Sequence, residues 1–418
     1  MDAGENTLTL TPTSPGASTW RRAVLGRLGQ LQRGTLTVED AGEVLSFGRP
    51  AADGLAARVV VRRPGFWRRL ALGGSVGAGE SYADGDWDAD DLTAVIRLLA
   101  RNREALSGLD RGLAWLGRPA ASLFALLRPN TRAGARRNIA DHYDLGNDFF
   151  ALMLDPTMTY SAAVFDPPEA TLEEASRRKL EILCRKLDLG PADHLLEIGS
   201  GWGSMAIHAA SRHGCRVTTT TISRAQHQLA TERVARAGLA GQVTVLLEDY
   251  RDLTGRYDKV VSVEMIEAIG AEQYPVFFER CAARLAPGGK LAVQAITIAD
   301  QEYQRARREV DFIKRHVFPG GCIPSVTALV GAATEASDLR LRHLEDYTPD
   351  YARTLAAWRD NLALQREAAA RITTERFRRL WDFYLCYCEG GFKERYVGLV
   401  QLVFDRPEVG AEGDRASH

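Results

Sequence analysis

The segment His194-Leu-Leu-Glu-Ile-Gly-Ser-Gly-Trp-Gly203 decides the fold that we predict for this chain. It begins as a short apolar strand that contains Glu197, and it runs directly into three glycines that alternate with other residues. Residues 204–211, Ser-Met-Ala-Ile-His-Ala-Ala-Ser, follow with a helical pattern. A strand that ends at glycines and restarts as a helix brings bare backbone close to a ligand at the carboxyl edge of a parallel sheet.

The spacing of these glycines indicates the kind of ligand. Gly199, Gly201 and Gly203 lie two residues apart, whereas the loop that cradles a dinucleotide pyrophosphate has the spacing G-x-G-x-x-G. The pattern therefore predicts a nucleoside cofactor without a phosphate, and S-adenosylmethionine (SAM) fits that description. A tight turn without any ligand is the alternative that the glycines alone leave open.

Length and charge limit the classes of function. A chain of 418 residues is longer than one average domain, so we expect two domains. Its 45% hydrophobic and 26% charged residues are typical of a soluble globular protein. A net charge of −1 gives no overall field that would attract nucleic acid, and the sequence lacks a basic groove interleaved with aromatics. We therefore expect no nucleic-acid partner.

Cysteine usage and the absence of membrane signals indicate the compartment. The six cysteines include no C-x-x-C pair, which favours reduced thiols and predicts neither disulfides nor a metal site. Residues 1–6 lack the basic and apolar parts of a signal peptide. No apolar run approaches the roughly 20 residues that span a bilayer. We expect a cytoplasmic protein that associates peripherally with the inner face of the membrane.

Composition along the chain predicts its domain organisation. Residues 1–18 are rich in Thr, Ser, Pro and Gly and are expected to be a disordered lead, and residues 409–418 a disordered tail. Residues 19–127 are expected to form a small α+β domain that faces lipid or takes part in a dimer. A linker rich in Pro, Gly and Arg at 128–138 separates it from a catalytic domain at 139–408.

The small domain has a local basic character. Residues 20–126 contain no lysine and more arginines than carboxylates. Residues 59–70 predict a strand and a turn with exposed arginines beside two aromatics, and residues 78–88 an acidic turn before an amphipathic helix at 92–102. Two interpretations stay open for the arginines: a solvated face, or a patch on anionic lipid headgroups worth ~1 kcal/mol per residue.

From residue 139 onward strands alternate with helices. Helical patterns at 224–237 and 271–285 separate strand candidates at 194–199, 216–221, 243–249, 259–264 and 290–296. This order predicts a parallel, doubly wound α/β sheet with helices on both faces. Two later segments, 340–345 and 396–404, would add an antiparallel edge pair and complete seven strands. Helical insertions at 301–315 and 351–387 are expected to form a substrate lid.

The ends of the second and third strands carry groups suited to a nucleoside. The second ends in the hydroxyls of Thr218-Thr-Thr-Thr221, where many nucleoside-binding sheets have a carboxylate for the ribose. Gln226, one turn into the next helix, offers an amide oxygen instead. Asp249 would accept from the adenine amino group, and Tyr250 would present an aromatic face to the ring. Trp202 is expected to pack over the cofactor or the substrate tunnel.

A series of segments resembles the cyclopropane-fatty-acyl-phospholipid synthases and the mycolic acid-type, SAM-dependent fatty-acid methyltransferases. These segments are Asp141-His-Tyr-Asp-Leu-Gly-Asn-Asp-Phe-Phe, Leu154-Asp-Pro-Thr-Met-Thr-Tyr-Ser-Ala, residues 197–203, 221–226, 248–253, 261–267 and 318–325, and Asp350-Tyr-Ala-Arg-Thr-Leu-Ala-Ala-Trp. The resemblance covers about residues 139–404 and implies a seven-stranded, Rossmann-like SAM-methyltransferase sheet. Residues 79–87 also look like part of the extra domain of the longer bacterial synthases.

The resemblance implies a set of cofactor contacts and a substrate. The residues that would bind SAM are Tyr160 and Ser161 at its methionine end, Glu197, Gly199, Gly201 and Gly203 around its aminoacyl part, Thr221 and Gln226 at the ribose, and Asp249 and Tyr250 at the adenine. An unsaturated phospholipid acyl chain would lie in an apolar tunnel with its cis double bond facing the sulfonium methyl. Because an alkene is a poor nucleophile, alignment and exclusion of water would supply most of the rate.

The base that ends the reaction is where this chain departs from the family. In cyclopropane synthases that base is thought to be a bicarbonate held by a Cys, a Glu, a His and a Tyr. Glu267 and Tyr351 match two of these ligands, whereas Ala162 stands at the Cys position and Gln294 at the His position. Gln294 could still donate one hydrogen bond. Ala268 also replaces the His that follows the family's Glu.

Glu264 adds a carboxylate where many cyclopropane synthases have a small residue. It would repel a bicarbonate, and it could itself act as the base if burial and Glu267 raise its pKa. We therefore expect methyl transfer followed by formation of a methylene or methyl-branched acyl product. The alternatives are a cyclopropane made with a rearranged bicarbonate site, a catalytically inactive SAM- or lipid-binding protein, and a purely structural Glu264–Glu267 pair.

The resemblance also implies partners. The longer synthases suggest a homodimer, and a saturated methyl branch would need a redox partner enzyme. A small-molecule N- or O-methyltransferase fits the fold but not the acyl-type lid segments.

Overall fold

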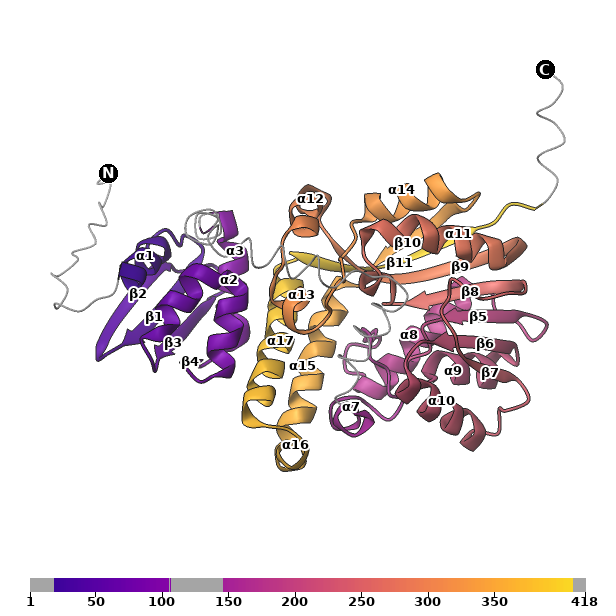
Figure 1. Ribbon diagram of the computed structural model, residues 1–418, viewed down its shortest axis with the longest axis horizontal. Helices are drawn as coiled ribbons and strands as arrows, with labels where there is room; N and C mark the ends of the chain where they lie inside the picture. Colours follow the sequence, from indigo (N-terminus) through magenta and orange to yellow (C-terminus); the bar gives the residue numbers. More distant parts are fainter. Residues whose placement is uncertain (1–18, 105, 107–145, 409–418) are drawn as a thin grey trace, which may run out of the picture. The chain divides into compact units, whose positions relative to one another are not determined.

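The computed structural model describes residues 19–104, 106 and 146–408 (Figure 1). They belong to two compact units, one within residues 1–119 and the other within residues 120–418. The predicted disordered lead, the linker at 128–138, the tail and the segment 141–145 lie outside the described residues.

The first unit is a small α+β fold, as the sequence predicts. Its four-stranded sheet has the order β2-β1-β3-β4, with β1 parallel to β3 and antiparallel to β2. The strands are β1 (Gly34–Asp40), β2 (Glu43–Arg49), β3 (Ala56–Val61) and β4 (Trp87–Ala89). The helices are α1 (Thr19–Leu28), α2 (Gly65–Ala83) and α3 (Leu92–Arg101), the last of them close to the predicted helix at 92–102.

The turns predicted within 59–70 and 78–88 are present at 62–64 and 84–86, but the helix between them was not predicted. Helix α2 begins at Gly65 and runs to Ala83, and it buries Phe66 and Trp67. The acidic segment then pairs with the basic one through Arg62–Asp88 at 3.0 Å, Arg63–Asp86 at 3.3 Å and Arg69–Asp84 at 2.7 Å. These carboxylates neutralise the arginines, which favours a solvated face over a lipid-binding patch.

The second unit is built on a seven-stranded sheet with the order β10-β11-β9-β8-β5-β6-β7 (Figure 1). Strand β11 alone runs antiparallel to its neighbours, so the predicted parallel sheet with an antiparallel edge is confirmed. The strands are β5 (His194–Ile198), β6 (Arg216–Thr221), β7 (Val243–Leu247), β8 (Tyr257–Val263), β9 (Leu285–Ile298), β10 (Arg340–Asp346) and β11 (Val397–Asp405).

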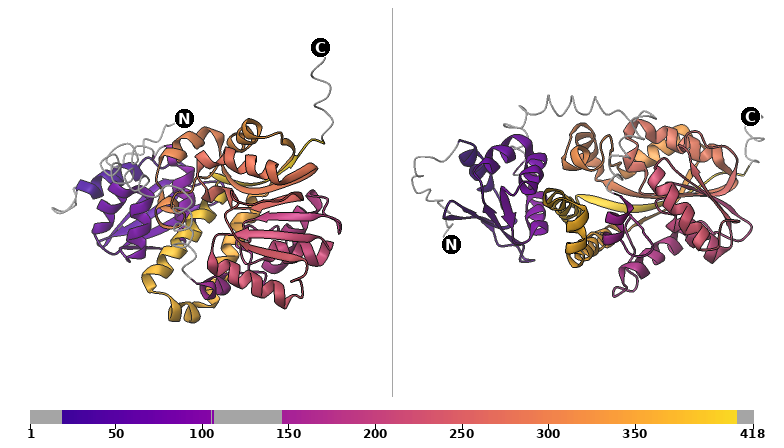
Figure 2. Two further views of the ribbon diagram at one scale, coloured as in Figure 1. Left: turned by 45° about the vertical axis from the view of Figure 1, so that its right-hand side comes forward. Right: turned by 60° about the horizontal axis from the view of Figure 1, so that its bottom comes forward.

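Helices cover both faces of this sheet, which confirms the doubly wound arrangement (Figure 2). Successive side chains of a strand point to opposite faces, so Leu195 and Val261 pack with one helical layer and Leu196 and Val260 with the other. The first layer contains α8 (Leu172–Lys186), α9 (Ser204–His213) and α10 (Arg224–Arg236), and the second α11 (Tyr274–Arg284) and α14 (Val326–Ala336).

The predicted helical insertions are present but broken into shorter pieces. The segment predicted at 301–315 forms α12 (Asp300–Arg308) and α13 (Phe312–His316), and the one at 351–387 forms α15 (Thr348–Leu364), α16 (Arg366–Ile372) and α17 (Glu375–Lys393). New N-caps cause two of the breaks: Asp311 accepts from Lys314 N and Thr374 from Phe377 N. No helix among the described residues is long and apolar enough to cross a membrane.

Candidate active site

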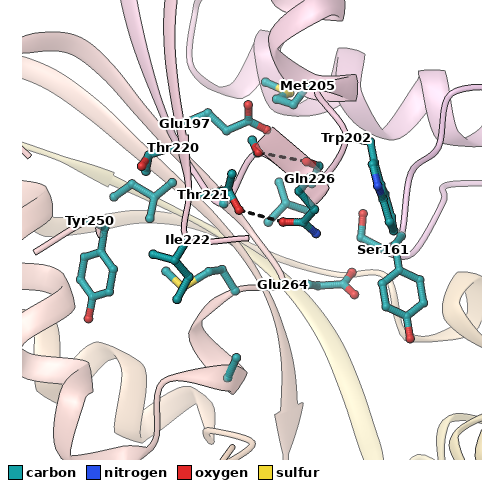
Figure 3. A pocket seen from close by; sticks show the side chains of 18 of the residues that line it. Ser161, Glu197, Trp202, Met205, Thr220, Thr221, Ile222, Gln226, Tyr250 and Glu264 are labelled. Carbon is teal, nitrogen blue, oxygen red and sulfur yellow. Dashed lines mark hydrogen bonds between the residues drawn. The ribbon is translucent and has the colours of Figure 1, made fainter. Parts of the chain in front are cut away.

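A pocket opens where β5, β6, β7 and β8 end at the carboxyl edge of the sheet. Ligands of open α/β sheets bind at this edge. Its lining includes residues 158–161 from the loop after α7 (Asn147–Met153), the glycine loop, and the ends of three further strands. Figure 3 shows Tyr250 at one end of the pocket, and Ser161, Trp202 and the Glu264 carboxylate at the other.

The glycine loop has the backbone geometry that only glycine adopts readily. Gly199, Gly201 and Gly203 have φ angles of 97°, 48° and 87°, in the left-handed region where a side chain is strained. A Cβ atom on Gly199 would also lie 3.3 Å from Cγ of Met265. Gly199 and Gly201 thus line the pocket with bare backbone, as the sequence predicts, whereas Gly203 is not part of the lining and lies next to Ala230 of α10.

Two buried charged groups lie beside the glycine loop. Glu197 is 3% exposed, and Oε2 of its carboxylate has no hydrogen-bond partner among the described residues. Burial raises the pKa of Glu197 to about 8. Lys179 is 1% exposed and donates to Oγ of Ser161 at 2.8 Å. Burial lowers the pKa of this ammonium to about 8, while the charges of Glu264 and Glu197 raise it.

The other end of the pocket carries the predicted nucleoside contacts. Thr221 Oγ1 donates to Gln226 Oε1 at 2.8 Å, which leaves this amide oxygen one further lone pair for a ligand (Figure 3). Asp249 is buried and forms a bidentate pair with Arg251 at 2.8 and 2.6 Å. Tyr250 also lines the pocket, and its ring packs against Phe277.

Glu264 receives three hydrogen bonds at the end of β8. Its Oε1 accepts from the backbone N of Ala162 at 2.9 Å and from Nε2 of Gln294 at 2.7 Å. Its Oε2 accepts from the Tyr351 hydroxyl at 2.5 Å. Burial raises the pKa of Glu264, while these three hydrogen bonds and the charge of Lys179 lower it. The side chain still lines the pocket, so its carboxylate is both held in place and accessible.

The backbone of Glu264 is unusual for this residue type. Its φ angle is 49°, in the left-handed region that favours glycine. A residue held in this region costs about 1–3 kcal/mol, and such strain persists where the surrounding structure fixes it. Only glycine, which has no Cβ atom, would relieve this strain, so the glutamate is held here by its side-chain contacts.

The other predicted catalytic residues lie behind Glu264. Gln294 and Tyr351 do not line the pocket and reach it only through the Glu264 carboxylate. Glu267 points away, because its Oε1 accepts from the backbone N of Ile296. Its Oε2 is buried without a hydrogen-bond partner among the described residues, and burial together with the charge of Glu264 raises its pKa to about 8. Glu264 thus takes the central position in which we expected Glu267.

Aromatic side chains enclose the pocket near Ser161. Tyr160 has ring contacts with Phe150 at 5.1 Å and Trp358 at 5.2 Å, and its hydroxyl lies 2.9 Å from that of Tyr384. Trp202 lines the pocket, as the sequence predicts, and its indole is held in place by donating to Asn147 Oδ1 on α7 at 2.8 Å. Aromatic faces stabilise cations through their quadrupole.

Some residues of the site are absent from the sequence-based prediction. Lys179 has a visible signal, because it falls at the same spacing as the buried Ala175 and Leu183 on one face of α8. A lysine on the apolar stripe of a helix is unusual. Lys186 and Gln401, which connect to Gln294 as described below, give no such signal.

One group of potential metal ligands lies away from the pocket. Ligand atoms of Cys184, His208 and His213 lie within 4.8 Å of one another. Both imidazoles share Oε2 of Glu181, at 3.1 and 3.2 Å. These hydrogen bonds to Glu181 account for the position of both imidazoles without a metal ion.

Comparison with known proteins places the chain in a family. The family model described as mycolic acid cyclopropane synthetase matches residues 130–402. The chain belongs to the mycolic acid cyclopropane synthetase family. It is 40% identical over 366 residues to the tuberculostearic acid methyltransferase UfaA1 of Mycobacterium tuberculosis, covering 85% of each chain. It is 35% identical over 370 residues to the cyclopropane-fatty-acyl-phospholipid synthase of Escherichia coli, covering 88% of this chain and 92% of that one.

Solved structures of the mycolic acid cyclopropane synthetase family share the fold of the second unit. The cyclopropane synthase MmaA2 of Mycobacterium tuberculosis superposes with a TM-score of 0.61 at 29% identity, covering 65% of this chain and 98% of that one. The mycolic acid cyclopropane synthase CmaA1, solved with S-adenosylhomocysteine (SAH), has the same TM-score at 28% identity, covering 65% of this chain and 98% of its own. The chain is therefore a SAM-dependent methyltransferase of this family.

Proposed function

We propose that this enzyme transfers the methyl group of SAM to the cis double bond of an unsaturated phospholipid acyl chain and leaves a methylene branch. In this proposal Glu264 accepts the proton that ends the reaction. The observation that carries it is the convergence of three hydrogen-bond donors on the Glu264 carboxylate, which still faces the pocket.

The pocket offers a complementary group for each part of SAM. The unpartnered, buried oxygen of Glu197 suits the ammonium of the methionine moiety, and Tyr160 and Ser161 lie at the same end. The glycine loop allows close approach of the aminoacyl part. Gln226 and Thr221 would bind the ribose, and Asp249 and Tyr250 the adenine. SAM supplies an electrophilic methyl group on a sulfonium sulfur.

The acyl chain is supported by the relatives and by the lining of the pocket. The Escherichia coli relative is named for a fatty-acyl phospholipid substrate. The lining also includes the apolar side chains of Met265, Ile269 and Phe318. Alkyl chains bind such surfaces through burial worth about 0.8 kcal/mol per CH2 group.

The proposed reaction balances without an external oxidant or reductant. The π electrons of the alkene form the new bond to the methyl carbon, the S–CH3 bond breaks, and SAH leaves. The neighbouring chain carbon becomes a cation, which the aromatic faces of Tyr160 and Trp202, both in the pocket lining, would stabilise. The methyl-bearing carbon then passes its hydrogen to the cation as hydride. Loss of a proton from the new methyl group to Glu264 leaves the methylene.

A bound bicarbonate does not fit this site. The donors at positions 162, 294 and 351, which would hold the anion, already donate to Glu264. A second anion would also face the carboxylate of Glu264 at short range, where like charges disfavour each other. In the proposed reaction bicarbonate therefore takes no part.

The hydrogen bonds to Glu264 bear on the choice between a methylene and a cyclopropane. Burial raises the pKa of this carboxyl group and the three hydrogen bonds oppose that rise, so Glu264 is a weaker base than an equally buried carboxylate without them. Slower removal of the methyl proton gives the cation time for the hydride shift that the methylene requires. The 40% identity to a relative named as a methyltransferase agrees with this outcome.

Analysis of the product tests this proposal. The purified enzyme is incubated with SAM and vesicles of a phospholipid with cis-monounsaturated chains, and SAH release and the fatty acid methyl esters are measured. Because a methylene and a cyclopropane product are isomers, proton NMR is needed to separate the alkene CH2 signal from that of the ring. A ring without a new alkene would overturn the methylene proposal and favour a cyclopropane synthase. Absence of SAH release would favour an inactive binding protein.

The remaining partners are predictions of the same proposal. We expect a homodimer that works at the inner face of the cytoplasmic membrane. Saturation of the methylene to a methyl branch would need a hydride donor, which a partner enzyme using reduced nicotinamide would supply.

A further inference from the structure

A chain of buried hydrogen bonds leads from Glu264 along one face of the sheet to the end of α8. Gln294 on β9 donates from Nε2 to Glu264 Oε1 at 2.7 Å. Gln401, its direct neighbour on β11, donates from Nε2 to Gln294 Oε1 at 2.9 Å. Lys186 donates from Nζ to Gln401 Oε1 at 2.7 Å. Both glutamines are fully buried, so no water competes for these groups along the way.

The outer end of this chain is anchored at the surface. Lys186 pairs with Glu345 on β10 at 2.6 Å, and its Nζ also donates to the Tyr347 hydroxyl at 3.2 Å. The side chain of Lys186 is 13% exposed and that of Glu345 is 45% exposed. The chain thus joins a carboxylate in the pocket to an ion pair at the β10 edge of the sheet, along the face that α8 covers.

The chemistry of the two ends fixes the direction of every bond between them. An ammonium group only donates and a carboxylate only accepts, whereas a glutamine amide can do either with its two ends. With Lys186 at one end, the oxygen of Gln401 must face it and the NH2 group must face Gln294. Gln294 then presents its own NH2 group to Glu264. Reversal of either amide would place two donors or two acceptors against each other in a buried site, at a cost of about 1–3 kcal/mol.

We infer that Lys186 is a positioning residue for the base: acting through Gln401 and Gln294, it holds the Gln294 NH2 group on Glu264 and so favours the ionised carboxylate. This inference rests on the proposed function of Glu264. A role in positioning Glu264 explains why Gln294 and Gln401 lie side by side on buried strands. Each would bury an unsatisfied amide if it were unpaired.

Other charged and titratable groups also face Glu264 and stay unchanged when Lys186 is replaced. Lys179 faces it from α8, Tyr351 from α15 and Glu267 from the 3-10 helix η2 (Ile266–Ala268). Burial raises the pKa of Glu264, and the hydrogen bond from Gln294 is among the interactions that lower it. Weakening this one hydrogen bond therefore raises the pKa of the base, and its protonated, inactive form extends to higher pH.

The test is the pH dependence of methyl transfer, followed by SAH release with unsaturated phospholipid vesicles. Lys186→Met removes the donor, and Gln401→Met breaks the chain at the next link. Both are expected to move the acid limb of the profile upward by about one pH unit, which is an approximately tenfold lower rate on that limb. Lys186→Arg keeps a cationic donor and is expected to restore the wild-type limb.

Two further variants make the outcome decisive. Lys290→Met removes a lysine of the same sheet that pairs with Asp188, outside the pocket and outside this chain of hydrogen bonds, and should leave the profile unchanged. SAH binding and the thermal midpoint confirm that each variant is folded, and if one linked variant does not fold, the other decides. An acid limb unchanged in the folded variants overturns the role of Lys186. Full activity of Glu264→Gln overturns the proposed base itself, so the two failures are separable.

Discussion

Replacement of Glu264 by glycine gives the sharpest prediction. The substitution removes the carboxylate and relieves a φ angle of 49°, a gain of about 1 kcal/mol for the backbone. It also leaves the Tyr351 hydroxyl and the Gln294 amide without their acceptor, which costs about 1–3 kcal/mol each if no water replaces it. We expect a folded enzyme with a slightly lower thermal midpoint. Because a general base contributes about 10²–10⁴-fold, the rate should fall by that factor.

The same substitution opens a space in which a small carboxylate can take the place of the side chain. Formate, acetate or bicarbonate should restore part of the activity of Glu264→Gly in a saturable way, since the donors at positions 162, 294 and 351 are still present. Glu264→Gln fills that space with an amide and should stay inactive with every one of these anions. The assay is SAH release in buffer freed of carbon dioxide, with each anion added in turn. Wild-type activity in Glu264→Gly without any added anion would refute the reasoning.

Three further predictions follow from the geometry of the site. Gly199→Ala should weaken SAH binding in calorimetry by about tenfold or more, because a Cβ at a φ of 97° meets Met265, whereas Gly241→Ala meets nothing and should bind normally. With SAM labelled as CD3, mass spectrometry should find two deuteriums in the product, and three would show that a chain carbon loses the proton. Glu267 has a pKa of about 8 in the folded state, so the folded protein holds a proton that the unfolded chain releases, and stability should fall from about pH 4.5 to 8. Glu267→Gln should reduce this slope, by at most about 1.4 kcal/mol per pH unit in chemical denaturation, while the buried Glu197, whose pKa is also raised to about 8, keeps its own share.

The parallel sheet could be predicted because its strands are apolar segments that end at polar or glycine-rich turns. The segment 194–203 gave β5, the glycine loop and the start of α9 almost to the residue. The lid was predicted less well, since its helices end at local caps such as Asp311 and Thr374, which sit within continuous helical patterns. Helix α2 after β3 was not predicted, because Phe66 and Trp67, next to four arginines, are buried by contacts distant in sequence.

The candidate site was predictable where its residues come from strand ends. Gly199, Gln226 and Asp249 all line one pocket because the carboxyl ends of parallel strands meet at one edge. The sequence could not show which of the two carboxylates, Glu264 or Glu267, faces the pocket. Glu264 and Glu267 are three residues apart, and only the left-handed backbone at Glu264 turns its side chain to the pocket and Glu267 towards the backbone of β9. The partnership of Gln294 with Gln401 depends on the register of β9 and β11, which no local pattern reveals.

The central claim is that a side chain of this enzyme, Glu264, replaces bicarbonate as the base. The most direct test is the rate of the wild-type enzyme on unsaturated phospholipid vesicles in buffer freed of carbon dioxide, measured again as bicarbonate is added back. We predict full activity without bicarbonate and the same rate after its addition. A rate that is low without bicarbonate and rises to saturation as it is added would contradict the claim.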